Sequence, residues 1–143
     1  QVKEYASKHN AEVVLISAKI EEELAELGED EAKEYLSELG IEDSGINRMI
    51  KSVYKLLNLL TFITAGEKEV HAWTVQAGAK APQAAGVIHT DFEKGFIRAE
   101  ITPYEEFVKN GSYAACKDKG VTRLEGKDYV VQDGDLVHFR FSV

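Results

Sequence analysis

The stretch Leu59–Gly66 (LLTFITAG) marks a change of periodicity in this 143-residue chain. Its apolar and small polar residues alternate, as is typical of a β-strand, whereas the residues before it repeat at helical spacing. Val70–Val75 has the same β-rich character, and Gly66 and Gly78 flank the two stretches. The pattern predicts a hairpin formed by Leu60–Thr64 and Val70–Val75, and it divides the chain between positions 58 and 59.

Short elements of mixed type follow the hairpin. Ala81–Val87 predicts a short helix with Pro82 in its first turn. Phe96–Ile101 predicts a strand, after which a helix begins near Tyr104 and ends at Gly111.

The last part of the chain predicts a closing hairpin. Tyr129–Val131 and Leu136–Phe141 would be its strands, joined by an Asp-Gly turn at residues 132–135. A small mixed sheet crossed by a helix is typical of the β-grasp, or ubiquitin-like, fold. We therefore expect residues 59–143 to form an α+β domain of that kind.

Residues 1–58 show a helix–strand–helix–helix pattern. Ala11–Ile16 is an apolar run with one Glu, which is typical of a strand covered on both faces in an α/β sheet. A helix is predicted to begin after Ser17 and a second helical stripe to end at Gly40. Asp43 or Ser44 would cap a further amphipathic helix.

The net charge of −8 is unevenly distributed. Residues 1–58 hold 7 Lys/Arg and 13 Asp/Glu, whereas residues 59–143 hold 10 and 12. Neither part is a strongly basic nucleic-acid binder, although a local basic face stays open for the second part. No stretch approaches the roughly 18 apolar residues of a membrane span, so no membrane partner is expected. Cys116 has no partner for an internal disulfide, which favours a reducing cytoplasm.

Motifs for catalysis are missing or incomplete. Residues 120–128 (GVTRLEGKD) have the wrong glycine spacing for a phosphate-binding P-loop, and Asp128 replaces its Ser or Thr. His89, Asp91 and Glu93 could be read as metal ligands, but a turn leading to the strand at Phe96 is the simpler interpretation. We therefore expect neither an independent enzyme nor a metal site.

Basic and aromatic residues alternate through the second part of the chain. Such a set could form a nucleic-acid face that combines stacking with phosphate contacts, or an ordinary solvated surface over core aromatics. The residues alone favour the second interpretation. The set comprises Lys80, Lys94, Arg98, Lys117, Lys119, Arg123, Lys127 and Arg140, with Trp73, Phe92 and Tyr113.

Ser17-Ala18-Lys19 follows the apolar run and precedes a helix. In P-loop GTPases a loop of this composition presents a backbone N–H to the carbonyl of the base, and the Lys stem lies over the ring. Three residues at the end of a predicted strand could equally be an ordinary connection.

Long blocks of the chain resemble the C-terminal region of the YchF, or Obg-like ATPase, family. The upstream stretches ISAKIEEELAEL and INRMIKSVYKLLNLL are similar to the end of that family's G domain. The blocks that carry the resemblance are Leu59–Gly66, Glu69–Trp73, Ala79–Asp91, Phe92–Glu100 and Glu125–Phe141.

The resemblance implies a P-loop G domain, an inserted coiled coil and a TGS domain of β-grasp fold. It makes residues 1–58 the end of the G domain and residues 59–143 the TGS domain. Only Ser17, Ala18 and Lys19 match a nucleotide-site motif, as the base-reading loop. ATP or GTP with Mg²⁺ is implied for the full-length parent. The P-loop, switch regions and Mg²⁺ ligands are missing, so we expect no cofactor and no hydrolysis here.

The resemblance also implies a binding module that contacts RNA or the ribosome in the cytoplasm. From the basic residues of the second part we choose Lys80, Lys94, Arg98 and Arg123 as the candidate contacts. A protein–protein module is the rival hypothesis. A ubiquitin-like carrier would need a Gly-Gly terminus, whereas this sequence ends with Ser142-Val143. We further expect the apolar run, centred on Val13–Ile16, to pair with another chain, to repack or to lack order.

Overall fold

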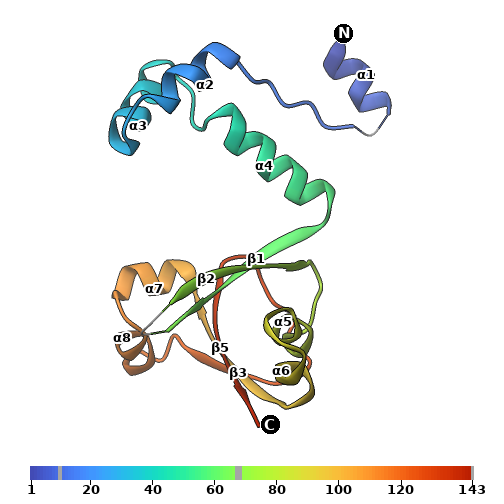
Figure 1. The fold of residues 1–143 in the computed structure, drawn as a ribbon, viewed down its shortest axis with the longest axis vertical. Coiled ribbons are helices and arrows are strands. Elements are labelled where there is room, and N and C mark those ends of the chain that lie inside the picture. Colours follow the sequence, from blue (N-terminus) through green and yellow to red (C-terminus); the bar gives the residue numbers. More distant parts are fainter. Residues whose placement is uncertain (10, 67–68, 143) are drawn as a thin grey trace. The chain divides into compact units, whose positions relative to one another are not determined.

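The computed structural model describes residues 1–9, 11–66 and 69–142 (Figure 1). Helices and strands both contribute, so the α+β class predicted from the sequence is confirmed. The chain divides into two compact units, residues 1–57 and residues 58–143. We call them the N-terminal unit and the C-terminal unit and describe each by itself. Val143, which the sequence analysis used in arguing against a ubiquitin-like carrier, lies outside the described residues.

The N-terminal unit is helical in its described part. Two serines cap helices where the sequence predicted their starts: the Ser17 Oγ accepts a hydrogen bond from the Ile20 N–H at 3.5 Å, and the Ser44 Oγ accepts one from the Asn47 N–H at 3.1 Å. Gly40 follows the third helix with a φ of +66°, as expected of a C-terminal glycine. The helices are α1 (Val2–Lys8), α2 (Ala18–Ala25), α3 (Glu29–Glu38) and α4 (Gly45–Leu56).

The strand predicted at Ala11–Ile16 does not form. The segment lies beside α4 instead: the Lys55 Nζ is 2.6 Å from the Glu12 Oε1, and the Arg48 guanidinium donates to the Leu15 carbonyl at 3.0 Å. A strand needs a neighbouring strand to satisfy its backbone groups. Within the described residues no strand pairs with this segment, so its apolar composition alone was a misleading signal.

The C-terminal unit is a five-stranded mixed sheet with the strand order β2-β1-β5-β3-β4. β1 and β5 run parallel at the centre, and the other pairs are antiparallel. The predicted first hairpin is confirmed, with Phe62 opposite Trp73. The strands are β1 (Leu59–Ala65), β2 (Val70–Gln76), β3 (Phe96–Pro103), β4 (Arg123–Glu125) and β5 (Asp135–Phe141).

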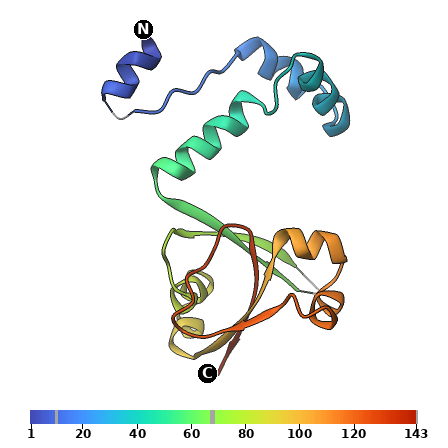
Figure 2. The ribbon, with the colours of Figure 1, turned by 180° about the vertical axis from the view of Figure 1, so that it is seen from behind.

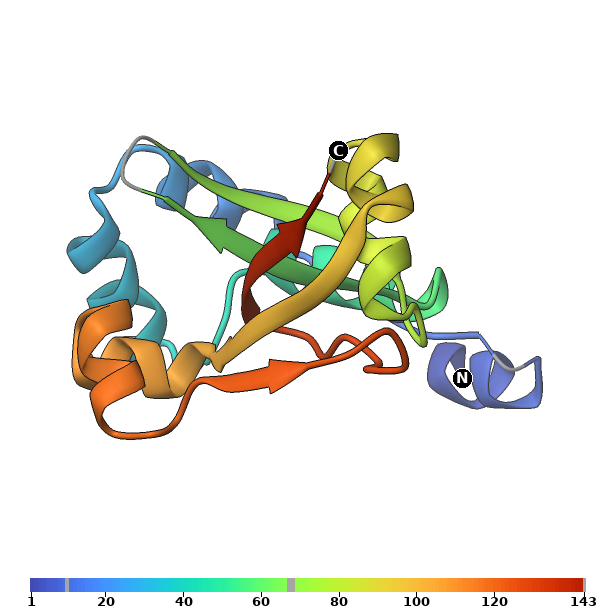
Figure 3. The same ribbon diagram turned by 90° about the horizontal axis from the view of Figure 1, so that it is seen from below.

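Helices lie on two sides of this sheet. Figures 1 and 3 show α5 and α6 together on one side and α7 and α8 on the other. The predicted helix at residues 81–87 is confirmed as α5, and Gly111 ends α7 with a φ of +77°. The helices are α5 (Ala81–Ile88), α6 (Thr90–Lys94), α7 (Tyr104–Asn110) and α8 (Tyr113–Asp118).

The core of the C-terminal unit lies between the sheet and α5. Phe62, Ile101 and Val137 of the three central strands are at most 1% exposed. Three alanines of α5 are completely buried, and their small side chains let the helix approach the sheet closely. The apolar alternation seen in the sequence therefore marks the face of the sheet that α5 covers.

The predicted closing hairpin is wrong. β5 pairs with β3 and β1, whereas Tyr129–Val131 makes only an isolated bridge between Val130 and Lys80. The segment between β4 and β5 runs past α5 instead (Figure 2), where the Ala81 N–H donates to the Tyr129 carbonyl at 2.8 Å. The turn before β5 does form, with Gly134 at a φ of +78°. A turn signal predicts a change of direction but does not identify the strand's partner.

Three short elements differ from the sequence prediction. Residues 90–94 form the helix α6, where a turn was expected, and α8 and β4 were not predicted at all. They contain 5, 6 and 3 residues, which is too short for a periodic pattern. None of the helices in the described part of the chain combines the length and apolar character needed to cross a membrane.

The phenol of Tyr129 ties the long β4–β5 segment to the start of β5. It donates to the Asp135 Oδ2 at 2.7 Å, and the Gln132 N–H donates to the same oxygen at 2.9 Å. Asp135 is only 3% exposed, so this carboxylate depends on those donors. Burial of Tyr129 and its bond to the carboxylate raise the pKa of the phenol.

We expect Tyr129→Phe to lower the free energy of unfolding by about 1–3 kcal/mol, because a buried carboxylate loses a donor. Urea denaturation followed by circular dichroism measures this. Tyr104→Phe is the matched control, since Tyr104 is 53% exposed. Equal stability of the two variants would contradict the assigned role of the phenol.

Candidate functional site

The loop Ser17–Lys19 lies at the start of α2 with its side chains in solvent. The Ser17 hydroxyl caps the helix, as described above. The Lys19 side chain is 83% exposed, and its Nζ is 3.9 Å from the Glu23 Oε1. The first backbone N–H groups of a helix have no partner within it, so this loop keeps donors that could face a base carbonyl. Its role as a base-reading loop stays a prediction.

The four basic candidates do not form a single surface. Lys80 is the N-cap residue of α5 and Lys94 is the last residue of α6, and these two helices lie on one side of the sheet. Arg98 alternates along β3 with the fully buried Ala99, which places it on the opposite face. Arg123 is on β4, at the edge of the sheet.

The candidates also differ in their partners. The Lys80 Nζ is 2.7 Å from the Asp128 Oδ1. The Arg123 Nε is 3.6 Å from the Glu125 Oε1, and its guanidinium lies 6.0 Å from the centroid of the Tyr129 ring. Within the described residues, Lys94 and Arg98 have no ion pair. No neighbouring carboxylate among the described residues therefore neutralises the positive charge of Arg98.

A cluster of charges surrounds Arg98 on the face of the sheet away from α5. We call Arg98, Glu100, Lys117 and Arg140 the Glu100 cluster. The Glu100 Oε1 accepts from the Arg140 Nε at 2.6 Å and also contacts a terminal nitrogen of the same guanidinium. The Glu100 Oε2 lies 2.6 Å from the Lys117 Nζ. Two cations from different elements thus hold one carboxylate.

Glu100 is buried, with 4% of the residue exposed. The hydrogen bond from Lys117, together with that from Arg140, holds the pKa of its carboxyl below the usual range despite the opposing effect of burial. Glu100 is therefore ionised at neutral pH. Lys117 and Arg140 each keep half of their side chain in solvent.

An aromatic groove of about 570 Å³ lies on the face of the sheet that α5 covers, lined by residues of β1, β2, α5, α6 and β5. Phe92 of this groove stacks on Phe141 with ring centroids 3.7 Å apart. The groove is lined by Thr64, Ala65, Gly66, Glu69, His71, Trp73, Ile88, Phe92, Val137, His138, Phe139 and Phe141. Flat apolar groups suit such a lining.

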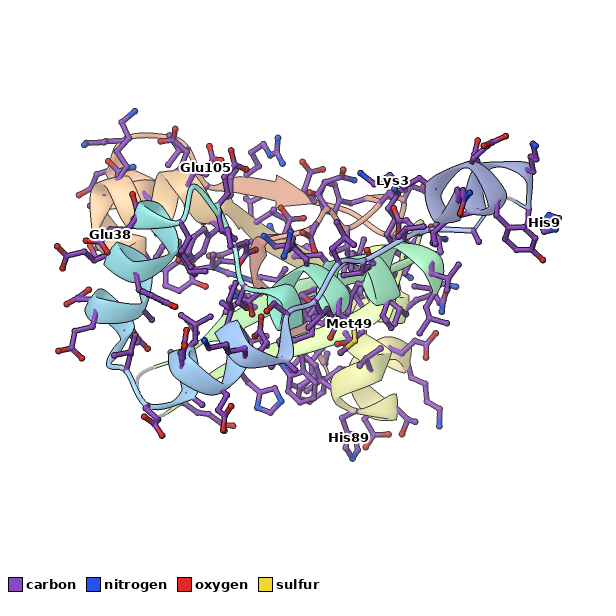
Figure 4. All side chains as sticks on the ribbon, turned by 90° about the horizontal axis from the view of Figure 1, so that it is seen from above. Lys3, His9, Glu38, Met49, His89 and Glu105 are labelled. Carbon is purple, nitrogen blue, oxygen red and sulfur yellow. The ribbon has the colours of Figure 1, made fainter. Side chains whose placement is uncertain are left out.

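The structure places His89 at the start of α6, and Asp91 and Glu93 within this helix. His89 lies at the junction of α5 and α6 (Figure 4), and its Nδ1 accepts a hydrogen bond from the Asp91 N–H at 3.2 Å. The described residues contain no group of three or more His, Cys, Asp or Glu side chains that could hold a metal ion. The local histidine instead caps a short helix.

The sequence analysis missed Glu100, and it named Lys117 and Arg140 within the wider basic set but not among the four candidate contacts. Alternation along β3 was a usable signal for Glu100, since it places Arg98 and Glu100 on one face. No local signal could reveal that α8 and β5 would bring Lys117 and Arg140 to the same carboxylate. That information is in the strand order.

Comparison with known proteins places the chain near one family. The family YchF-GTPase_C, described as "Protein of unknown function (DUF933)", matches residues 59–142. The Ribosome-binding ATPase YchF of Bacillus subtilis is 55% identical over 143 residues, which are 100% of this chain and 39% of that protein. Obg-like ATPase 1 of Gallus gallus is 46% identical over 99% of this chain and 36% of its own length.

A solved structure gives the same result. The Schizosaccharomyces pombe YchF GTPase superposes with a TM-score of 0.80 at 38% identity, covering 97% of this chain and 37% of that one. The chain thus spans about two fifths of the length of the relatives it matches.

The Glu100 cluster leads to a prediction about acid sensitivity. The pKa of Glu100 is lower in the folded than in the unfolded protein, so its contribution to stability is complete above the unfolded pKa of about 4.3 and is lost as the pH falls through the folded value. We expect Glu100→Gln to lower the free energy of unfolding at pH 7 by about 1–2 kcal/mol, because the two cations are half exposed and partly regain water.

The difference between wild type and Glu100→Gln should shrink as the pH falls below the unfolded pKa and towards the lower pKa of the folded protein. Urea titrations at pH 7 and pH 3.5 measure it. Glu105→Gln on α7 (Figure 4) is the control, because Glu105 is exposed. A difference that is the same at both pH values would contradict the role assigned to the ionised carboxylate.

Proposed function

Because this chain belongs to the YchF-GTPase_C family, we propose that it is the C-terminal part of a ribosome-associated, nucleotide-dependent protein. In this proposal the C-terminal unit is a TGS domain that contacts RNA or the ribosome. The observation that carries it is the 55% identity, over the whole chain, to a protein named as a ribosome-binding ATPase. Ribosome association implies a place of action in the cytoplasm.

The topology of the C-terminal unit supports the assignment as a β-grasp domain. A mixed sheet with two parallel central strands and a helix packed across one face is what that fold requires. The domain assignment, with residues 1–58 as the end of a nucleotide-binding domain and residues 59–143 as the TGS domain, is part of the same proposal.

The nucleotide is assigned to the longer protein rather than to this chain. Ser17, Ala18 and Lys19 could contact a base through the start of α2, but the Ser17 hydroxyl already caps the helix and Lys19 is in solvent. The described residues hold no carboxylate cluster fit for Mg²⁺. Phosphoryl transfer needs positioned phosphates and a metal ion, and the residues described here fit neither.

We expect the 143-residue chain alone to release no phosphate from ATP or GTP in the presence of Mg²⁺. A phosphate-release assay over several hours measures this, with a longer family member as the positive control. Turnover that co-purifies with the chain through two chromatographic steps would refute this assignment.

The function of the C-terminal unit is tested by binding to ribosomal subunits and to a short single-stranded RNA. Each neutralised phosphate of a single strand contributes a slope of about −0.7 to the dependence of log affinity on log salt. With about three such contacts, we expect the affinity to fall about twentyfold between roughly 50 and 200 mM salt. Fluorescence anisotropy measures the RNA affinity and pelleting measures ribosome association.

Salt dependence also separates the rival function. An apolar protein–protein interface barely changes over this salt range, because screening acts on charges. Salt-independent capture of a ribosomal protein would favour the rival, and the aromatic groove is the surface suited to it. Light scattering of the same samples at two concentrations tests self-association through Val13–Ile16, which a monomer at both concentrations would exclude.

A further inference from the structure

The Glu100 cluster holds more positive charge than its carboxylate neutralises. Arg98, Lys117 and Arg140 carry three positive charges, and Glu100 carries one negative charge. These side chains, with Thr122 and Leu124, line a pocket of about 270 Å³ on the face of the sheet away from α5. The pocket therefore has a net charge of +2, although the C-terminal unit as a whole is slightly acidic.

Arg98 and Arg140 are directly opposite each other on adjacent strands. Like charges at such a position destabilise a sheet, and Arg98 has no ion pair in the described part of the chain to offset this. An exposed strand position accepts many uncharged residues without cost. Two arginines here are unfavourable for the fold alone, and conflicts of this kind are expected where a surface binds something.

Glu100 positions Lys117 and Arg140 but occupies only some of their N–H donors. It contacts the Nε and one terminal nitrogen of Arg140, and it contacts the Lys117 ammonium from one side. The guanidinium and the ammonium each have further N–H groups, and about half of each side chain is in solvent. Fixed side chains with free donors lose little conformational entropy when they bind an anion.

The cationic pocket and the aromatic groove lie on opposite faces of the sheet. Glu100 is paired across the sheet with His138, whereas the rings of the groove, among them Trp73 and Phe139, lie on the face that α5 covers. The geometry of the pocket therefore points to an anion, and guanidinium groups bind the oxygens of phosphates and carboxylates. The proposed contact with RNA or the ribosome selects a nucleic-acid phosphate as that anion.

We propose that Arg98, Lys117 and Arg140 form a phosphate subsite for single-stranded RNA, with Glu100 as the residue that positions Lys117 and Arg140. The choice of RNA rests on the proposed function, whereas the anion site itself rests on the geometry. Lys80, Lys94 and Arg123, the other candidates from the sequence, lie outside this subsite.

The anion site is tested without RNA by titrating the 143-residue chain with inorganic phosphate at constant ionic strength. Nuclear magnetic resonance follows the Nε–H signals of the arginines. We expect saturable shifts for Arg98 and Arg140, and none for Arg48, which donates to a backbone carbonyl in the N-terminal unit. Absence of saturable shifts at Arg98 and Arg140 would overturn the site, whatever the result with RNA.

The RNA assignment is tested with oligouridylate at two salt concentrations. We expect Arg98→Glu to weaken binding about fivefold or more and to reduce the magnitude of the salt slope by about 0.7, as for one lost phosphate contact. Lys109→Glu on α7 is the control, because it makes the same change of charge at a side chain that is 74% exposed. It should leave binding within about twofold of wild type.

Thermal unfolding of the same variants separates binding from folding. Arg98→Glu would face Arg140 with an opposite charge, so its melting temperature should be equal to or above that of wild type. Weaker binding together with undiminished stability supports a binding role for Arg98. Equal weakening by Arg98→Glu and Lys109→Glu would overturn the subsite but leave the proposed function intact.

Two further outcomes distinguish the claim of an anion site from the claim that its ligand is RNA. If wild type binds no oligouridylate at either salt concentration, the RNA assignment and the RNA-binding part of the proposed function both fail, and the phosphate titration still decides the anion site. If polyglutamate of matched charge displaces oligouridylate equally well, the ligand is an acidic chain in general, which overturns the RNA assignment.

Discussion

The insertion of β5 between β1 and β3 is the constraint on which the C-terminal unit depends. β5 is the last strand along the sequence but the central strand of the sheet. Its residue Val137 belongs to the core between the sheet and α5 and is 1% exposed. For β5 to reach this place, the segment before it must cross the sheet, which it does along α5. Burial of Asp135, with hydrogen bonds from Tyr129 and Gln132, fixes the point where the strand begins.

The same insertion creates the chemistry of the exposed face. Because β5 lies beside β3, Arg140 is opposite Arg98, and the carboxylate of Glu100 is within reach of Arg140 and of Lys117 from α8. A buried carboxylate needs such partners. The fold therefore concentrates positive charge on one surface of a unit whose overall charge is slightly negative, and it does so at some cost to sheet stability.

In the N-terminal unit, an amphipathic helix leaves apolar residues exposed. α4 is strongly amphipathic, yet its apolar residues Ile46, Met49, Ile50 and Val53 are between 42% and 47% exposed. A helix of this kind gains most of its stability from burying its apolar face. The helix ends are nevertheless well defined by Ser17 and Ser44, because capping is a local interaction that needs no tertiary partner.

The sequence by itself determined the α+β class, the helices with clear caps, the first hairpin and the apolar face of each central strand. These features depend on residues a few positions apart, where periodicity and capping act. Only the tertiary structure decided that residues 11–16 form no strand, that β5 pairs with β3 and β1, and that Arg98 rather than Lys80, Lys94 or Arg123 belongs to a charged cluster. Those outcomes depend on which distant segments become neighbours. Pairing of that kind is set by burial and backbone hydrogen bonding across the whole sheet, and it leaves no mark on any one stretch of the chain.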